Sequence, residues 1–135
     1  GDEWWWVDLG TQSLDRVIIR WEDAYAAKHF VGWSDDGTHF TGYWFDVNSP
    51  GEHSYNLGTR RARYLGVLMR DPAPRMNNYS FWEFEAHHGG ASASAQGEAD
   101  STETIEVTPS GDLVHLERPA ATKGANVVFL PLVKR

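Results

Sequence analysis

The sequence contains no cysteine and no apolar run long enough to cross a membrane. Without cysteine, the chain has neither a disulfide framework nor a thiolate metal site. A membrane-spanning helix needs about 20 consecutive apolar residues, so we expect no membrane insertion. Basic residues are also scarce, because 12 lysines and arginines oppose 19 acidic residues and leave a net charge of −7. This balance argues against nucleic acid as the main partner, since phosphate binding needs a concentrated basic surface.

The periodicity of a normal-length helix is missing as well, whereas many short stretches have the patterns of β-strands. Turn sequences separate these stretches at close intervals. The expected strands are 4–10, 16–22, 29–34, 40–47, 54–57, 62–69, 80–87, 104–108, 113–117 and 126–133. This spacing predicts an all-β protein with a sandwich or barrel architecture.

Polar segments between the expected strands predict turns and loops. Residues 11–15 form a polar connection, and residues 48–51 form a turn whose proline and glycine preclude ladder pairing. Residues 58–61 form a polar bend. Residues 70–79 carry two prolines and an Asn-Asn pair, which predicts a long loop. Loops of that length are often functional.

The length of 135 residues fits one domain with a core of its own. We expect a β-sandwich core in residues 1–89. Residues 90–100 are mostly small and polar, which predicts a flexible connection. Residues 101–135 are expected to add β-strands that pack on the same sandwich.

A short connection after the strand 16–22 is the first candidate for a binding surface. It places Glu22, Asp23 and Tyr25 close together, where side chains meet a partner without disturbing the core. Aromatic residues are abundant, with seven Trp, five Tyr and six Phe, and suit both cores and ligand platforms. Trp4 and Trp6 share the second face of the first strand. Either another part of the chain covers them, or they form an exposed aromatic platform.

Five sequence blocks occur in the order of a known family. They are VDLG, IIRWEDAYA, SDDGTHFT, ARYLGVLM and YSFWEFEA, between residues 7 and 86. Together they resemble the discoidin family of coagulation factor V/VIII type C domains, which overlaps with carbohydrate-binding module family 32. The resemblance implies a galactose-binding-like jelly-roll sandwich of antiparallel strands, with a ligand site in the loops at one end. It is strongest to non-catalytic modules of bacterial glycan-degrading enzymes, including chitosanase discoidin domains.

The resemblance places the family's site loops on Glu22 and Tyr25 and on residues 77–79. Sugar hydroxyls pair with carboxylates, amides and guanidinium groups, and the apolar face of a sugar ring stacks on an aromatic ring. Combining both arguments, we predict seven ligand-binding residues. They are Glu22, Asp23, Tyr25, Arg70, Asn77, Asn78 and Tyr79.

Alternatives to this site stay open. Glu22 could instead pair with Arg20 or Arg70, while Tyr25 caps the edge of the core. A glucosamine-type ligand favours the carboxylates, whereas an acidic glycan favours Arg70 and Arg75.

Other family features are missing from the sequence. Discoidin domains usually begin well before the VDLG strand, with a first strand and a loop that often holds a structural calcium, yet here only residues 1–3 precede Trp4. We therefore expect neither calcium nor another cofactor. Residues 101–135 lie outside the family pattern and are expected to replace the missing strand.

Catalytic and metal sites are not indicated. Glu83 and Glu85 share one face of a strand, whereas glycosidase carboxylates usually face each other across a cleft. His87 and His88 are adjacent and point to opposite sides of a strand, which does not suit shared metal ligation. Residues 35–37 lack the further ligands of a calcium loop and predict a turn.

We therefore expect an extracellular or cell-surface module that binds a glycan and brings a larger exported protein, with other domains, to polysaccharide. One alternative is a protein-interaction or adhesion module, which an exposed face at Trp4 and Trp6 would indicate. Another is an accessory domain that packs on a catalytic neighbour and buries the loops around Glu22 and Tyr79.

Overall fold

The computed structural model describes residues 2–88, 103–107, 114–116, 120–121 and 126–129, and no helix occurs among them. None of these residues belongs to a helix that could cross a membrane. The strands are β1 (Glu3–Trp21), β2 (Ala26–Ser34), β3 (His39–Asp46), β4 (Gly51–Pro72), β5 (Phe81–His87), β6 (Glu103–Glu106), β7 (Val114–Leu116), β8 (Ala120–Ala121) and β9 (Asn126–Phe129). The predicted all-β class is therefore confirmed.

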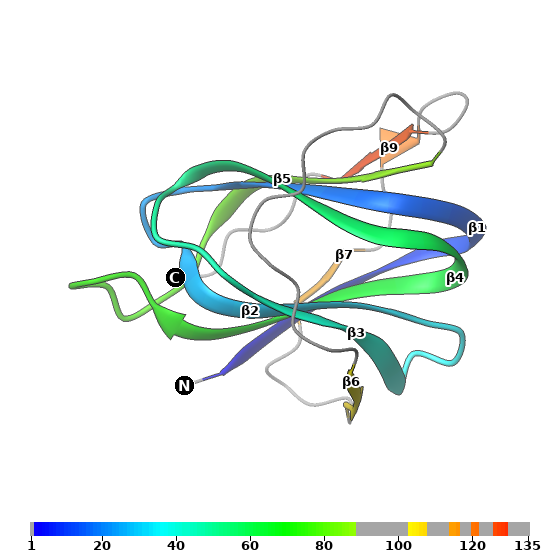
Figure 1. Cartoon of the computed structure of the whole chain (residues 1–135), viewed down its shortest axis with the longest axis horizontal. Helices are drawn as coiled ribbons and strands as arrows, with labels where there is room; N and C mark the ends of the chain where they lie inside the picture. Colours follow the sequence, from blue (N-terminus) through cyan, green and yellow to red (C-terminus); the bar gives the residue numbers. More distant parts are fainter. Residues whose placement is uncertain (1, 89–102, 108–113, 117–119, 122–125, 130–135) are drawn as a thin grey trace.

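Two long strands, β1 and β4, run through both layers of the molecule (Figure 1). Residues 3–8 of β1 pair with residues 64–69 of β4 in the layer that contains β2, β3 and β6. Residues 16–21 of β1 pair with the beginning of β4 and with β5 in the layer that continues to β9 and β8. Among the described residues, every strand pair is antiparallel except that of β7 with β1.

Register shifts mark the bends at which β1 and β4 pass from one layer to the other. Gly10 lies in one irregular stretch with a φ of 63°, and Gly58 lies in the other with a φ of 72°. A residue without a Cβ adopts these angles at little cost. The chain does bend at 11–15 and 58–61, but the prediction that these polar segments separate strands is wrong, because bulges absorb the polar residues while pairing continues.

Two further boundaries differ from the prediction. Gly51 begins β4 and pairs with Trp21. The prediction that the turn 48–51 lies entirely outside the ladder is therefore wrong for Gly51. β4 also continues to Pro72, which shortens the predicted loop. Pro72 has no N–H to donate to the ladder, but it is tolerated here because it is the last residue of β4 and lies opposite Ala26 at the end of the pairing with β2.

The main core lies between the two layers and follows the predicted alternation. Trp5 and Val7 point into it from one half of β1, and Val17, Ile19 and Trp21 from the other half. Each of these side chains is at most 1% exposed. Alternate residues of a strand point to opposite faces, so the local pattern predicts which side chains are buried.

A second hydrophobic cluster covers the outer face of the β2–β3–β4 layer. It consists of Trp4, Phe30, Phe40 and Trp44, and Trp4 is only 5% exposed. The interpretation in which the chain itself covers Trp4 is therefore confirmed, while Trp6 is half-buried beside this cluster.

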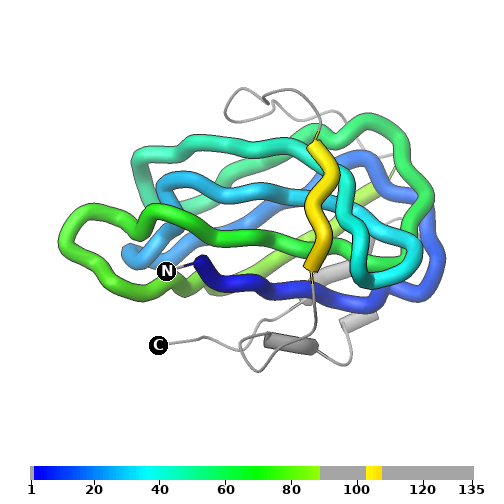
Figure 2. The backbone as a smooth tube through the Cα atoms, turned by 90° about the horizontal axis from the view of Figure 1, so that it is seen from below, coloured from blue at the N-terminus to red at the C-terminus, as the bar shows by residue number. Residues whose placement is uncertain are grey.

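Part of that cover comes from β6, which runs across the outer side of the layer (Figure 2). β6, β7 and β9 overlap the strands predicted at 104–108, 113–117 and 126–133, and they pair with β3, β1 and β5. The division of the chain into 1–89, 90–100 and 101–135, and the replacement of a first strand, stay predictions. Residues 90–100 lie outside the described residues.

Candidate ligand-binding site at one end of the sandwich

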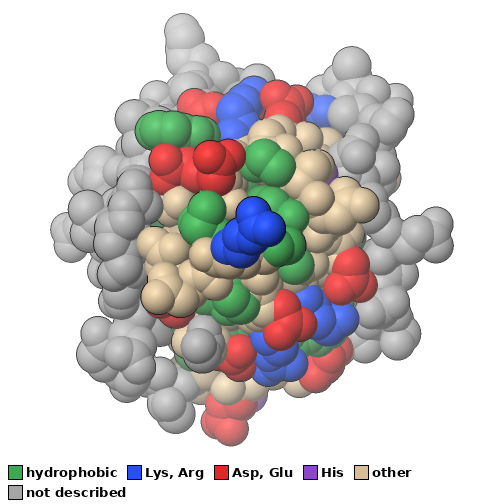
Figure 3. All heavy atoms as spheres, turned by 90° about the vertical axis from the view of Figure 1, so that its left-hand side faces the viewer, with side chains coloured by type: hydrophobic (Ala, Val, Ile, Leu, Met, Phe, Trp, Pro, Cys, Tyr) green, Lys and Arg blue, Asp and Glu red, His purple; other side chains and the backbone are tan. Residues whose placement is uncertain are grey.

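A hollow of about 340 Å³ opens where the loop between β1 and β2 meets the connection between β4 and β5. Figure 3 views this end of the molecule and shows hydrophobic side chains around the middle of the face, where a lysine or arginine side chain also lies, with acidic side chains above and below. The lining residues are Trp21, Glu22, Asp23, Ala24, Met76, Asn78, Ser80 and Trp82. Both acidic and large apolar groups therefore border the same hollow.

Backbone hydrogen bonds join the two loops that form the hollow. Ser80 N donates to Ala24 O at 2.8 Å, and Glu22 N donates to Ser80 O at 3.2 Å. Ala73 N donates to Tyr25 O at 3.0 Å. Because these bonds pair the loops directly, the positions of the lining residues depend on the sheet rather than on a free loop.

The most exposed large apolar residue in the described part of the chain is Trp82, with 64% of its surface accessible. Arg20 pairs with Glu83, and the next residue, Trp21, pairs with Phe81. Trp82 is thus the extra residue of a β-bulge in β5. A bulge re-aims a side chain, and here it turns the indole out of the core and toward the hollow.

This bulge corrects the predicted face of the strand at 80–87. The alternation placed Trp82, Phe84 and Ala86 together on an apolar face opposite Phe81. In the structure Phe81, Phe84 and Ala86 are all buried, at about 4% exposure or less, and Trp82 is outside. One inserted residue shifts the alternation by one position, which no local pattern reveals.

Three of the predicted site residues come together at the hollow. Glu22 is half-buried, Asp23 is exposed and Asn78 is half-buried, and all three line it. The lining contains two carboxylates and no lysine, arginine or histidine. In the described structure, this hollow therefore offers hydrogen-bond acceptors and negative charge.

The two predicted tyrosines lie elsewhere. Tyr25 is 8% and Tyr79 is 4% exposed, and both belong to the main core. Burial raises the pKa of Tyr79 to about 12, so its phenol is neutral at physiological pH. Neither ring lines the hollow. These tyrosines support the loops from below, which agrees with the alternative in which Tyr25 caps the core.

Arg70 and Asn77 also lie outside the lining. Arg70 donates hydrogen bonds to Asp2, with 2.9 Å between Nη2 and Oδ2, and its guanidinium lies 4.7 Å from the ring centre of Trp44. The hydrogen bond from Arg70 lowers the pKa of Asp2. Asn77 is exposed beside the hollow.

Arg20 is engaged on the neighbouring sheet surface. It forms ion pairs with Glu52, Glu83 and Glu85, of which the Glu52 pair measures 3.1 Å. The hydrogen bond that Arg20 donates to Glu85 is the main cause that raises the pKa of Arg20. Glu83 and Glu85 thus share one cation on the face of β1 and β5, and do not face each other across the hollow.

Sequence reasoning missed five lining residues, which are Trp21, Ala24, Met76, Ser80 and Trp82. Met76 had a local signal, because it is the one large apolar side chain in the polar segment 70–78. It is 37% exposed and borders the same hollow as Trp82. Among the described residues, no group of three acidic or histidine side chains is placed to hold a metal ion.

Comparison with known proteins gives matches among solved structures. No protein-family model matches the sequence, and no curated protein is significantly similar to it. Chitosan-binding module 1 from the chitosanase/glucanase of Paenibacillus sp. IK-5 is similar in structure, with a TM-score of 0.57 and 28% sequence identity. The match covers 62% of this chain and 66% of that module, slightly less than two thirds of its length.

A second solved structure, of a selenomethionine-labelled mutant of the same module, matches with a TM-score of 0.55 and 28% identity. This match covers 60% of this chain and 64% of that one. The matched proteins are binding modules of a glycan-degrading enzyme rather than its catalytic domain. Together with the strand pairing, the comparisons confirm the predicted antiparallel β-sandwich.

Proposed function

We propose that this chain is a non-catalytic carbohydrate-binding module whose site is the hollow between the β1–β2 and β4–β5 connections. The observation that carries the proposal is the exposed indole of Trp82 beside the carboxylates of Glu22 and Asp23. An apolar ring next to hydrogen-bond acceptors suits a sugar, which has an apolar ring face and a rim of hydroxyls.

The charge of the lining narrows the proposed ligand to a glycan with basic amino groups. The carboxylates of Glu22 and Asp23 attract an ammonium group, and the lining of the hollow contains no lysine, arginine or histidine. An acidic glycan would meet repulsion at the same place. The similar solved structures reported above are of a chitosan-binding module, which supports a glucosamine polymer as the ligand class.

The sequence blocks that resemble discoidin domains, and their galactose-binding-like jelly roll, belong to the same proposal. Glycan binding at one end of the sandwich fits a module within a larger extracellular or cell-surface protein. The module would bring that protein to polysaccharide. A catalytic role has little support, because Glu83 and Glu85 both pair with Arg20 on one sheet surface. The alternative of an adhesion surface at Trp4 is also weakened, because Trp4 is buried.

Replacing Trp82 with alanine tests the site. We expect Trp82→Ala to weaken binding of chitosan oligosaccharides at least tenfold, because loss of about 1.4 kcal/mol of stacking and burial has that effect. Isothermal titration calorimetry measures it. Asn77→Ala is the matched control, since Asn77 is exposed in the same connection but does not line the hollow. Equal affinity of the two variants would place the binding site elsewhere.

The carboxylates are tested separately with neutral variants. Glu22→Gln and Asp23→Asn should each weaken binding of chitosan oligosaccharides more than binding of fully N-acetylated ones, because acetylation removes the ligand's positive charge. Asp35→Asn is the control, as Asp35 is an exposed acid on the turn between β2 and β3. Failure of the folded wild-type chain to bind any glycan would contradict the proposed function.

A further inference from the structure

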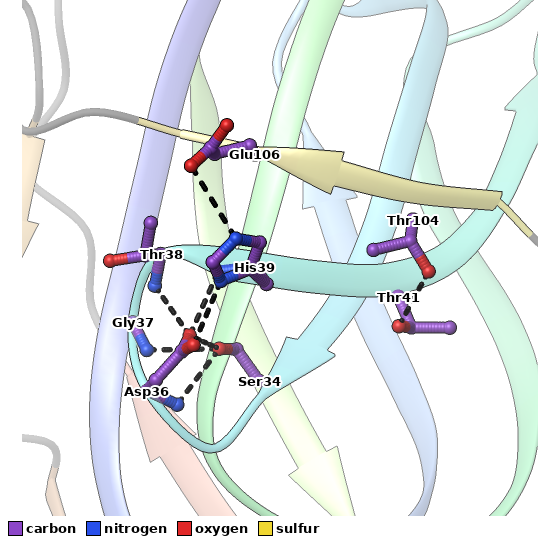
Figure 4. Close-up of polar contacts among 8 residues, drawn as sticks. All are labelled: Ser34, Asp36, Gly37, Thr38, His39, Thr41, Thr104 and Glu106. Atoms are coloured by element: carbon purple, nitrogen blue, oxygen red, sulfur yellow. Dashed lines mark hydrogen bonds and ion pairs between the residues drawn. The ribbon is translucent and has the colours of Figure 1, made fainter.

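We propose that His39 is a pH-dependent clamp that holds β6 on β3. His39 is the first residue of β3, and its imidazole lies between two carboxylates from different segments (Figure 4). Nδ1 is 2.9 Å from Asp36 Oδ2, and Nε2 is 3.4 Å from Glu106 Oε2. Asp36 belongs to the turn before β3, and Glu106 is the last residue of β6. One imidazolium therefore links an edge strand to the turn beside it.

The Asp36 side of the clamp is held firmly in place. Asp36 Oδ1 accepts hydrogen bonds from the backbone N–H groups of Thr38 and His39, each at 2.8 Å, and from Ser34 Oγ at 3.0 Å. The hydrogen bond from the His39 N–H is the main cause that lowers the pKa of Asp36 far below its usual value. Asp36 stays ionised over the whole physiological range, so it is a fixed anionic partner for His39.

The β6 side of the clamp has few other attachments. β6 pairs with only four residues of β3, and Val107 N donates to Thr38 O at 2.7 Å. Its two other side-chain bonds join Thr104 to Thr41 and Glu103 to the indole N–H of Trp44. A short edge strand with so few contacts opens more easily than an interior strand. One ion pair at its end therefore changes how often β6 detaches from β3.

The side chains under β6 give the clamp a structural consequence. Ile105 lies opposite Phe40 in the pairing, and Ile105 and Val107 pack on the aromatic cluster of the outer face. Phe40 is fully buried. Loosening of β6 therefore uncovers the Phe40 side of this cluster together with the backbone edge of β3.

The direction of the pH dependence follows from the groups that face His39. These groups are Asp36 on the turn and Glu106 on β6, and both favour the imidazolium, chiefly through the hydrogen bond to Asp36, so the pKa of His39 is raised. Glu103, the other acid of β6, bonds Trp44 instead. A raised pKa means that the clamp is complete below pH 6.5 and is lost as the pH rises through the pKa of folded His39.

Hydrogen exchange of single amides, followed by NMR from pH 6.0 to 8.5, tests the clamp. We expect the protection factor of the Val107 amide to fall about two- to fivefold as the pH rises, the range of an exposed ion pair. The Phe30 amide in the interior strand β2 should keep its protection. A Val107 protection factor that does not change with pH would overturn the proposal.

Variants separate the clamp from other titrations. In Glu106→Gln the turn around Asp36 is intact, yet Val107 should lose its pH dependence and the pKa of His39 should fall toward 6.5. His39→Gln should give low protection at every pH. His53→Gln is the control, because His53 lies on β4 and contacts the backbone oxygen of Ser49 in the turn before it. This variant should behave as wild type. A wild-type profile in Glu106→Gln contradicts the clamp.

Discussion

Acidification from pH 6.5 to pH 4 is expected to remove about 3 kcal/mol from the free energy of unfolding through one residue, His29. His29 is fully buried between the layers. Burial lowers its pKa from 6.5 to about 4, and Asp46, His53 and Lys28 are the charged or titratable groups that act on it more weakly. The effect is large because, between pH 6.5 and about pH 4, His29 binds a proton in the unfolded chain but not in the folded protein.

The hydrogen bonds around His29 explain why the neutral ring is required. The Nδ1–H donates to Ala26 O at 3.0 Å, which leaves Nε2 as an acceptor for the hydroxyl of Tyr55 at 2.7 Å. The indole N–H of Trp21 donates to the same hydroxyl at 3.2 Å. A proton on Nε2 of His29 would point at the hydroxyl proton of Tyr55. Within this network the Tyr55 hydroxyl has no other acceptor to which it could turn.

The sign of the effect is that of a lowered histidine pKa. The contribution of His29 is fully present above pH 6.5 and decreases as the pH falls to the folded pKa near 4. Trp21 lines the candidate site, so this network also supports the floor of the hollow.

Urea unfolding of the wild type and of His29→Gln between pH 7 and pH 4 measures the contribution. The variant should be less stable at pH 7 but should lose about 3 kcal/mol less on acidification. All other titrating groups are shared, so the difference between the two curves isolates His29. Parallel curves would show that His29 does not limit stability in acid.

Gly66→Ala is expected to destabilise the wild-type protein by about 1–3 kcal/mol, although alanine is normally the better residue inside a strand. A Cβ at Gly66 would lie 2.1 Å from Cη2 of the Trp4 indole. Gly66 pairs with Gly32, which also pairs with Gly42, so three glycines lie side by side under the outer aromatic cluster. The rings of Trp4 and Phe30 lie where a Cβ at Gly66 or Gly32 would be, whereas a Cβ at Gly42 would meet the backbone of Val31 and Gly32.

The same substitution should have the opposite sign when the indole is removed. The three nearest atoms to the new Cβ all belong to Trp4. In a Trp4→Leu background, Gly66→Ala should therefore be neutral or stabilising by about 0.4–1 kcal/mol, through the reduced entropy of the unfolded chain. Thermal and urea unfolding of the four proteins gives the coupling energy. If the effects of Trp4→Leu and Gly66→Ala on stability are additive, the cost of Gly66→Ala does not come from a clash with the Trp4 indole.

Several properties of this protein were determined by its sequence alone. The alternation around Trp5, Val7, Val17 and Ile19 predicts strands and buried faces, because a side-chain period of two is local. The acidic connection at Glu22 and Asp23 likewise predicts a polar rim at one end of the sandwich. Both residues do line the hollow.

The rest was decided by tertiary structure, because it depends on which strands pair and in what register. The Trp82 bulge is defined by the pairing of β5 with β1, in which Arg20 lies opposite Glu83 and Trp21 opposite Phe81, and it exposes the Trp82 indole. Tyr25 and Tyr79 have the composition of a sugar platform, yet packing beneath the loops buries both rings. Local patterns report the period of a strand, but a bulge or a buried ring is set by a partner distant in the sequence.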